Sequence, residues 1–204
     1  MSPSIKITKD EINALPLRSY EGPVTIVDSD QKLKEALKAI RREKVLGFDT
    51  ESRPSFKKGQ NFPASLIQLG GAKQVWLFQI QKFENMESLW KILANRDIIK
   101  AGVAIADDIK KLQELIDFKP AGFVEIADLT QKAGILNTGL RSLAGLLLNF
   151  RISKRAQVSN WARSQLTEAQ VQYAATDAWV SRELYCHMQK MKKRARKPAA
   201  QARK

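Results

Sequence analysis

The chain has 204 residues, 44% of them hydrophobic, and a formal net charge of +14. This length suits one domain with a sizeable core, and no apolar run approaches the roughly 20 residues that a membrane span needs. The single cysteine, Cys186, and the single histidine, His187, exclude an internal disulfide, a thiolate zinc cluster and a His-rich zinc site. Because the first residues lack the apolar core of a secretory signal, we expect a soluble, intracellular protein of the cytoplasm.

The positive charge is concentrated at the end of the chain. The segment from Lys190 to Lys204 carries eight Lys and Arg residues and no acid, which leaves +6 for residues 1–189. Such a surface favours a phosphate-bearing polymer, a nucleic acid, as partner, although charge of this kind also serves solubility. We predict a basic, disordered tail at 191–204, since it has little apolar surface to bury.

Capping residues, turn residues and hydrophobic periodicity predict the helices and strands along the chain. Thr8 and Glu11 form a capping box, which predicts a short helix that ends near Pro16. Runs of β-branched and aromatic residues predict strands at 24–29, 45–52, 64–71, 73–80, 97–105 and 122–129. Apolar residues at helical spacing predict helices at 30–44, 85–96, 106–116, 139–150 and 167–193.

This order of elements indicates an α/β fold, with a mixed central β-sheet and α-helices on both of its faces. The third and fourth strands are expected to form a hairpin, and the last two helices are expected to pack on the sheet. We predict an N-terminal extension at 1–23, one domain at 24–190 and the tail at 191–204.

The first string with chemical content is FDTES. Asp49 and Glu51 are two residues apart in a predicted strand, so their side chains face the same side. Two such carboxylates repel each other unless a cation lies between them. Mg²⁺ and Mn²⁺ are the cations that carboxylate oxygens usually bind. A strand end that emerges into solvent would explain the pair equally well.

Two further strings carry acids. In KAGVAIADDIKKL, Asp107 and Asp108 open a helix, where acids are also favoured by the helix dipole alone. In QYAATDA, Tyr173 and Asp177 are four residues apart and share one helix face, although an exposed aspartate and a core tyrosine would fit the same spacing. Together the three strings match two-metal phosphodiester cleavage, which needs about four carboxylates and no histidine.

These residues resemble the DEDD exonuclease superfamily in its tyrosine subclass, to which ribonuclease D and the exonuclease domain of the Werner syndrome helicase belong. The resemblance runs from about Thr25 to Met188, and it implies a ribonuclease H-like fold with the carboxylates at one end of the sheet. FDTES matches the first motif of the family and YAATDA the third. KAGVAIADDIKKL matches the second, whose register selects Asp108 and puts Asp107 where glycine is usual.

The resemblance also implies roles. Two divalent cations, Mg²⁺ or Mn²⁺, would be held by the carboxylates of Asp49, Glu51, Asp108 and Asp177. Tyr173 would orient or deprotonate the attacking water. The residues expected near the 3′-terminal nucleotide are Phe48, Thr50, Leu66 and Ile109.

The implied activity is 3′-5′ exonuclease cleavage that releases nucleoside 5′-monophosphates. The expected partner is single-stranded or 3′-recessed DNA, with RNA as the alternative. We expect no membrane partner and no obligate protein partner, and a bacterial protein would lie near the nucleoid.

Two alternative functions remain. A phosphatase of the haloacid dehalogenase type would need D-x-D where Glu51 stands, and a catalytically inactive nucleic-acid-binding module of the same fold would have no use for clustered acids.

Overall fold

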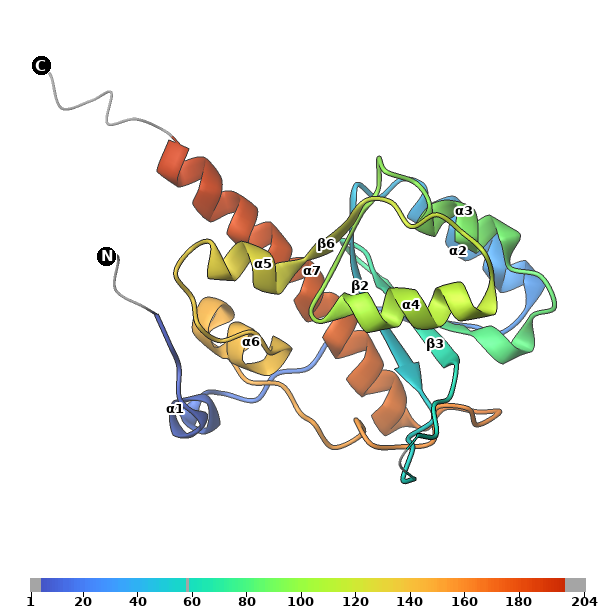
Figure 1. Cartoon of the computed structure of the whole chain (residues 1–204), viewed down its shortest axis with the longest axis horizontal. Coiled ribbons are helices and arrows are strands. Elements are labelled where there is room, and N and C mark those ends of the chain that lie inside the picture. The colour runs from blue at the N-terminus through green and yellow to red at the C-terminus, as the bar shows by residue number, and fades with distance from the viewer. Residues whose placement is uncertain (1–4, 58, 197–204) are drawn as a thin grey trace, which may run out of the picture.

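A six-stranded mixed sheet forms the centre of the molecule, with helices on both faces (Figure 1). The computed structural model describes residues 5–57 and 59–196. Its strands are β1 (Val24–Val27), β2 (Val45–Ser52), β3 (Ala64–Gly70), β4 (Val75–Gln79), β5 (Ile99–Gly102) and β6 (Phe123–Glu125). The helices are α1 (Lys9–Ala14), α2 (Asp30–Ile40), the 3-10 helix η1 (Ile80–Lys82), α3 (Glu87–Leu93), α4 (Ile105–Leu115), α5 (Ile126–Gln131), α6 (Leu140–Leu148) and α7 (Glu168–Arg196).

The strand order is β1-β4-β3-β2-β5-β6. β3 runs antiparallel to β2 and β4, whereas the pairs β1–β4, β2–β5 and β5–β6 are parallel. The predicted α/β class with a mixed sheet is therefore confirmed, and so is the hairpin of β3 and β4. Because β2 and β5 are parallel neighbours, the carboxyl end of β2 and the start of α4 meet at one edge of the sheet.

The two faces of the sheet are buried by different helices. One core cluster joins α2, α3 and α4 to inward side chains such as Phe48, Ile67 and Phe78. On the other face, α7 lies against β2 and β3, and α6 packs on α7 through a cluster that includes Leu143, Val180 and Leu184. Among the described residues, no helix combines the length and the apolar character that crossing a membrane requires.

Helix α7 approaches the sheet at the level of the backbone. Gly47 of β2 is paired with Gly70 of β3, and a Cβ added to Gly47 would overlap the carbonyl oxygen of Ala178. A Cβ on Gly70 would lie 2.7 Å from the same oxygen. Glycine at both positions thus lets the helix lie directly on the two strands.

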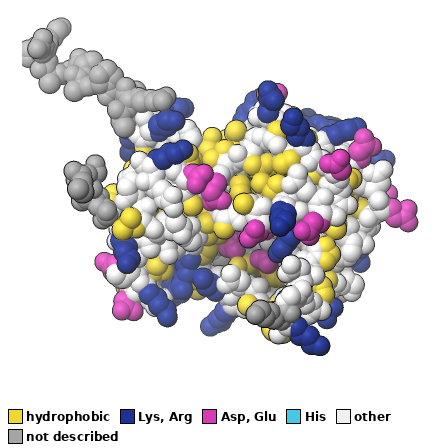
Figure 2. All heavy atoms as spheres, in the orientation of Figure 1, with side chains coloured by type: hydrophobic (Ala, Val, Ile, Leu, Met, Phe, Trp, Pro, Cys, Tyr) yellow, Lys and Arg dark blue, Asp and Glu magenta, His cyan; other side chains and the backbone are white. Residues whose placement is uncertain are grey.

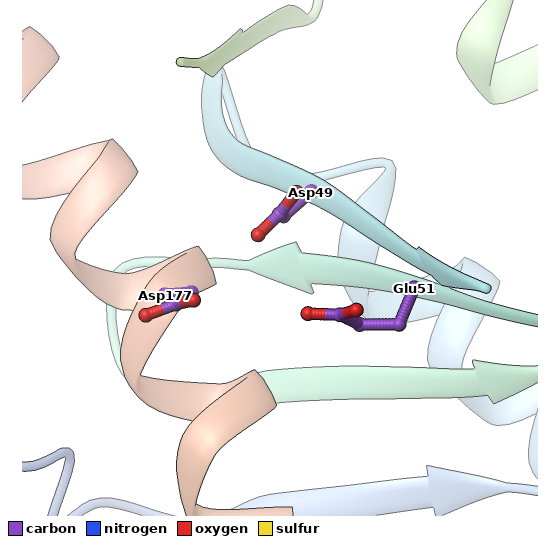
Figure 3. A group of neighbouring side chains, drawn as sticks. All are labelled: Asp49, Glu51 and Asp177. Carbon is purple, nitrogen blue, oxygen red and sulfur yellow. The ribbon is translucent and has the colours of Figure 1, made fainter. Parts of the chain in front are cut away.

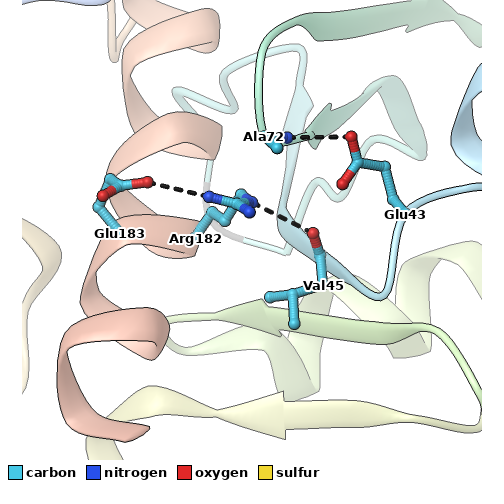
Figure 4. A network of polar contacts seen from close by, with 5 residues as sticks. All are labelled: Glu43, Val45, Ala72, Arg182 and Glu183. Carbon is cyan, nitrogen blue, oxygen red and sulfur yellow. Dashed lines mark hydrogen bonds and ion pairs between the residues drawn. The ribbon is translucent and has the colours of Figure 1, made fainter. Parts of the chain in front are cut away.

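Polar contacts fix the same helix beyond that point (Figure 4). The Arg182 Nε donates to the carbonyl oxygen of Val45 at 3.3 Å, and its Nη1 pairs with Glu183 at 3.1 Å. Nearby, the Glu43 carboxylate accepts from the amide of Ala72 at 3.1 Å and ties the start of β2 to the β3–β4 turn. The position of α7 along β2 is therefore set at two levels of the strand.

Most predicted elements are shorter in the structure, and the differences at β5, at β6 and at the end of α7 bear on the site or the tail. The strand predicted at 97–105 ends at Gly102, and the one predicted at 122–129 ends at Glu125, where helix α5 begins. The Glu125 carboxylate accepts hydrogen bonds from the amides of Ile105 and Ala127, so it caps both α4 and α5. In the predicted disordered tail, α7 continues to Arg196, and residues 197–204 lie outside the described part of the chain.

Candidate active site

Three carboxylates converge at the carboxyl end of β2 (Figure 3). Asp49 and Glu51 project from the strand and Asp177 projects from α7, with one ligand oxygen of each within 4.8 Å of the others. The alternation of a β-strand puts Asp49 and Glu51 on the face that α7 covers. Because the backbone of Ala178 packs directly on Gly47, the preceding residue, Asp177, lies opposite Asp49.

Asp108 lies beside this trio and is joined to it through Thr50. The Thr50 hydroxyl donates to the Asp108 carboxylate at 2.5 Å, and the Thr50 amide donates to Asp49 at 2.9 Å. Asp107 is exposed, whereas Asp108 is half-buried and turned toward the other acids. The structure thus brings Asp108, and not Asp107, to the cluster, as the family register selects.

Burial, and for Asp49 and Glu51 also the charges of neighbouring acids, raises the pKa values of these carboxylates. Loss of water, together with the charges of Asp177 and Asp108, raises the pKa of Glu51 to about 9. Loss of water first, and then the charges of the other three acids, holds the pKa of Asp49 well above its ordinary value. Burial also raises the pKa of Asp177 to about 7, against the opposing effects of the Tyr173 hydroxyl and of Lys154.

Two features of these acids suit a divalent cation: their carboxylate chemistry and one buried oxygen atom without a hydrogen-bond partner. Asp177 is 4% exposed, and its buried Oδ1 has no hydrogen-bond partner among the described residues. A buried carboxylate oxygen without a donor is costly, and a hard cation satisfies such oxygens while it removes the mutual repulsion. Asp49, Glu51 and Asp177 are therefore the residues that would hold a metal, with Asp108 at its edge.

Tyr173 completes the cluster from one helical turn before Asp177. Its ring packs on Trp161, with centroids 5.9 Å apart, and it lines the same cleft as the acids. Burial, and next the Asp177 charge, raises the pKa of Tyr173 above its ordinary value, so the metal-free protein keeps the phenol protonated. A protonated phenol at this point can donate a hydrogen bond to a bound oxygen.

Comparison with known proteins agrees with this constellation. Residues 24–193 match the model of a family described as 3′-5′ exonuclease. The chain belongs to the 3′-5′ exonuclease family. This family comprises nucleic-acid-degrading hydrolases that depend on divalent metals. Membership in it excludes the haloacid dehalogenase alternative.

Several relatives illustrate the membership. Exonuclease 3′-5′ domain-containing protein 2 of Mus musculus is 39% identical over an alignment of 189 positions, which covers 84% of this chain and 28% of the relative. The bifunctional 3′-5′ exonuclease/ATP-dependent helicase WRN of the same organism is 35% identical over an alignment of 147 positions, which covers 69% of this chain and 10% of the relative. The chain thus spans well under half of the length of these relatives.

A solved structure supports the fold independently. The Nibbler EXO domain of Aedes aegypti superposes with a TM-score of 0.78 and 25% identity, over 90% of this chain and 94% of that domain. Escherichia coli RNase D has the same fold, with a TM-score of 0.72 and 21% identity, over 82% of this chain and 45% of its own. The ribonuclease H-like fold that the resemblance implied is thereby confirmed.

Asp49, Glu51 and Asp177 line a cleft of about 620 Å³, and lysines and an arginine also line it. The cations are Lys9 of α1, Arg141 of α6 and Lys154 of the loop before α7. Figure 2 shows one face of the molecule, on which acidic side chains lie near the middle and at the edges with Lys and Arg side chains among them. A polyanion can thus be held near acids that would otherwise repel it.

The N-terminal segment of residues 5–17 forms one wall of this cleft. The Asn137 side chain accepts from the amide of Ile7 at 2.8 Å and donates to its carbonyl oxygen at 3.1 Å. Arg141 donates to the side chain of Asn13 at 2.7 Å, and bridges join Ile5 to Ile135 and Leu17 to Arg151. The predicted extension is therefore fixed to the residues around α6, although the family match begins only at residue 24.

Sequence reasoning missed the cations in and beside the cleft. Lys111 lies near the acids but does not line the cleft; it follows Asp108 by one turn of α4 and donates to the Ser52 hydroxyl at 3.3 Å. Burial raises the pKa of both Glu51 and Asp108, and the charge of Lys111 partly offsets that rise. The spacing of three residues between Asp108 and Lys111 was an available signal. Lys9 and Lys154 reach the cleft through tertiary contacts alone, and no local pattern marks them.

The four residues expected near the terminal nucleotide lie in different surroundings. Phe48 and Leu66 are fully buried, one beneath each face of the sheet, so neither can stack on a base. Ile109 is half-buried against the core cluster of α2, α3 and α4, and it is not among the residues that line the cleft. Thr50 does line the cleft, where it holds Asp108.

Proposed function

We propose that the chain removes nucleotides from the 3′ end of single-stranded or 3′-recessed DNA and releases nucleoside 5′-monophosphates. The observation that carries the proposal is the convergence of Asp49, Glu51 and Asp177 within 4.8 Å in a cleft that Tyr173 also lines. A non-catalytic binder would have no reason to bury these mutually repelling acids where a polyanion binds.

In this proposal the carboxylates of Asp49, Glu51 and Asp177, together with Asp108, would hold two divalent cations, Mg²⁺ or Mn²⁺. When bound, the cations would supply charge neutralisation and an activated water for the in-line displacement. The chain itself contributes orientation, because the Tyr173 hydroxyl holds the water and Thr50 fixes both Asp49 and Asp108.

DNA is the first candidate substrate and RNA the second. Names among the relatives support DNA, since they include a helicase-linked exonuclease and DNA polymerase I of Aquifex aeolicus, which is 28% identical over 81% of this chain. Ribonuclease D of Haemophilus influenzae, 27% identical over 81% of this chain, supports RNA. Matched DNA and RNA strands therefore belong in the first assay.

The test is the degradation of one oligonucleotide sequence, as DNA and as RNA, labelled at its 5′ or its 3′ end. With Mg²⁺ or Mn²⁺ we expect a 5′-labelled ladder, immediate release of the 3′ label as a mononucleotide, and no product in EDTA. Asp177→Ala and Asp49→Ala should lose essentially all cleavage and remain folded. Tyr173→Phe should cleave more slowly, by about 10²-fold or more.

Two outcomes would count against the proposal. Wild-type protein that binds the strands but cleaves none of them with either metal would favour the inactive binding module. Wild-type activity in Asp177→Ala would overturn the assignment of the site.

A further inference from the structure

A second pocket, of about 530 Å³, lies immediately beside the catalytic cleft. It is formed by the loop that follows β2 and by the loop that precedes α7, and both loops lie together at the lower edge of the molecule in Figure 1. Glu51 lines the cleft and Arg53 lines the pocket, and likewise Gln157 lines the cleft and Val158 the pocket. The two hollows are therefore lined by neighbouring residues of the same two segments of the chain.

The pocket combines exposed aromatic surface with positive charge. The Phe56 side chain is 84% exposed and Val158 is 68% exposed. The Arg53 guanidinium lies over the Phe62 ring, 4.9 Å from its centroid, and Lys57 adds a further cation. Among the described residues that line the pocket there is no acid.

Hydrogen bonds hold both walls in place. The Gln170 Nε2 donates to the Ser159 hydroxyl at 3.0 Å and to the Asn160 carbonyl oxygen at 3.1 Å. Gln170 itself belongs to the cap of α7, the helix that carries Tyr173. On the other wall, the Ser55 hydroxyl donates to the carbonyl oxygen of Lys57 at 2.9 Å. The wall from α7 is thus anchored to the helix that also carries part of the catalytic cluster.

We propose that this pocket binds the substrate strand upstream of its 3′-terminal nucleotide. Phe56 and Phe62 would stack on bases, and Arg53 and Lys57 would contact phosphates. This proposal rests on the proposed function. Aromatic faces with interleaved cations are the usual platform for single-stranded nucleic acid, because every base has a face to stack and every linkage has a charge. The position of the pocket beside the cleft identifies the strand as substrate.

The expected consequence is a dependence on substrate length. An oligonucleotide of about ten nucleotides spans the cleft and the pocket, whereas the p-nitrophenyl ester of thymidine 5′-monophosphate occupies the cleft alone. Loss of one stacking contact should weaken binding of the oligonucleotide by roughly 5- to 100-fold. The small ester should be cleaved as before, because the catalytic acids are untouched.

The experiment uses the full chain and two readouts. Fluorescence anisotropy in EDTA gives the Kd for the labelled oligonucleotide without cleavage, and steady-state kinetics with Mn²⁺ gives kcat/KM for the ester. The variants are Phe56→Ala, Phe56→Trp and the pair Arg53→Gln with Lys57→Gln. The controls are Leu115→Ala, at an exposed apolar residue outside both hollows, and Lys73→Gln, in the exposed β3–β4 turn.

We expect Phe56→Ala and the double variant to raise the Kd at least fivefold, with Phe56→Trp and both controls close to wild type and the ester unaffected. An unchanged Kd in both Phe56→Ala and the double variant would overturn the proposal. A protein partner would then be the remaining candidate ligand of the pocket. An equal loss on the ester would also overturn it, since the loops would then act through the catalytic cluster. Failure of the proposed function would appear separately, as wild-type protein that cleaves neither substrate.

Discussion

Asp49, Glu51 and Asp177 give the metal-free protein a predictable dependence on pH. Their folded-state pKa values lie above those of the unfolded chain, with Glu51 at about 9 and Asp177 at about 7. The folded state therefore binds more protons than the unfolded state between about pH 4 and pH 9. The stability that this contributes is fully present below about pH 4 and is lost as the pH rises through the folded-state values.

We accordingly expect the Tm measured in EDTA to fall as the pH rises from about 5 to 9. Asp49→Asn should flatten this fall and raise the Tm at pH 8, because it removes one of the repelling charges. In the wild type, Mg²⁺ in place of EDTA should flatten the fall of the Tm with pH, since the cation neutralises the carboxylates in place of the protons. Glu35→Gln, on the exposed surface of α2, is the matched control and should keep the wild-type slope. A wild-type slope in Asp49→Asn would contradict the assignment of this charge cluster.

Sequence reasoning located the acids and failed at their apolar neighbours for one physical reason. Spacing two along a strand and four along a helix fixes which residues share a face, so Asp49 with Glu51 and Tyr173 with Asp177 were accessible. The same spacing does not reveal which face a helix covers. The family resemblance, and not the spacing, placed Phe48 and Leu66 near substrate, yet each lies under a different layer of helices.

At the scale of elements, the contact of α7 with β2 determines how far Asp177 lies from Asp49. Gly47→Ala should push the helix away, because its Cβ meets the Ala178 carbonyl oxygen and lies 2.7 Å from the Arg182 nitrogen. We expect a loss of about 1–3 kcal/mol in the free energy of unfolding and a fall in kcat of about 10²-fold. Chemical denaturation and single-turnover cleavage measure the two effects.

The matched control for that variant is Gly145→Ala in α6. Its added Cβ meets only the ends of side chains, at 3.2 to 3.4 Å. Stability and kcat should both stay near wild type. A Gly47→Ala protein with full activity would show that α7 tolerates displacement and that its seat on the sheet does not control the site.

The N-terminal segment should act on substrate binding and not on the chemical step. Lys9→Gln removes a cation from the cleft wall, so we expect a KM raised several-fold with kcat nearly unchanged. Lys6→Gln is the matched control, because Lys6 is exposed and is not among the residues that line the cleft. Equal effects of the two substitutions would assign the change to overall charge.

Element boundaries were predictable where a local signal marks them. The capping box at Thr8 and Glu11 lies where the sequence places it, and α7 begins at Glu168, one residue after the predicted start of that helix. The end of β6 was missed because Glu125 caps two helices at once, and one of these, α4, lies twenty residues earlier in the chain. Long-range partners of this kind leave no local pattern.

At the scale of the whole molecule, the basic end of α7 lies far from the catalytic acids. Lys192, Lys193 and Arg194 are exposed and about fifteen residues beyond Asp177, or roughly 22 Å along the helix axis. Changing these three to Gln should reduce the slope of log Kd against log salt by up to about 2 for a long single strand. A strand of about five nucleotides bound in the cleft should show no change.

Titration of both strands by fluorescence anisotropy over a range of salt concentrations checks this prediction. An unchanged slope on the long strand would show that the end of α7 does not touch nucleic acid. A reduced slope on the short strand would instead mean that these charges act on the cleft at long range.

The placement of Tyr173 and Asp177 on α7 also bears on how the protein is made. Asp49 and Glu51 leave the ribosome early, but the helix that completes their cluster is the last element of the described chain. Contacts between such distant segments form late, after loop closure. A nascent chain that lacks α7 therefore has no assembled candidate site. We expect such a chain to have no nuclease activity until α7 has been synthesised and has packed on the sheet.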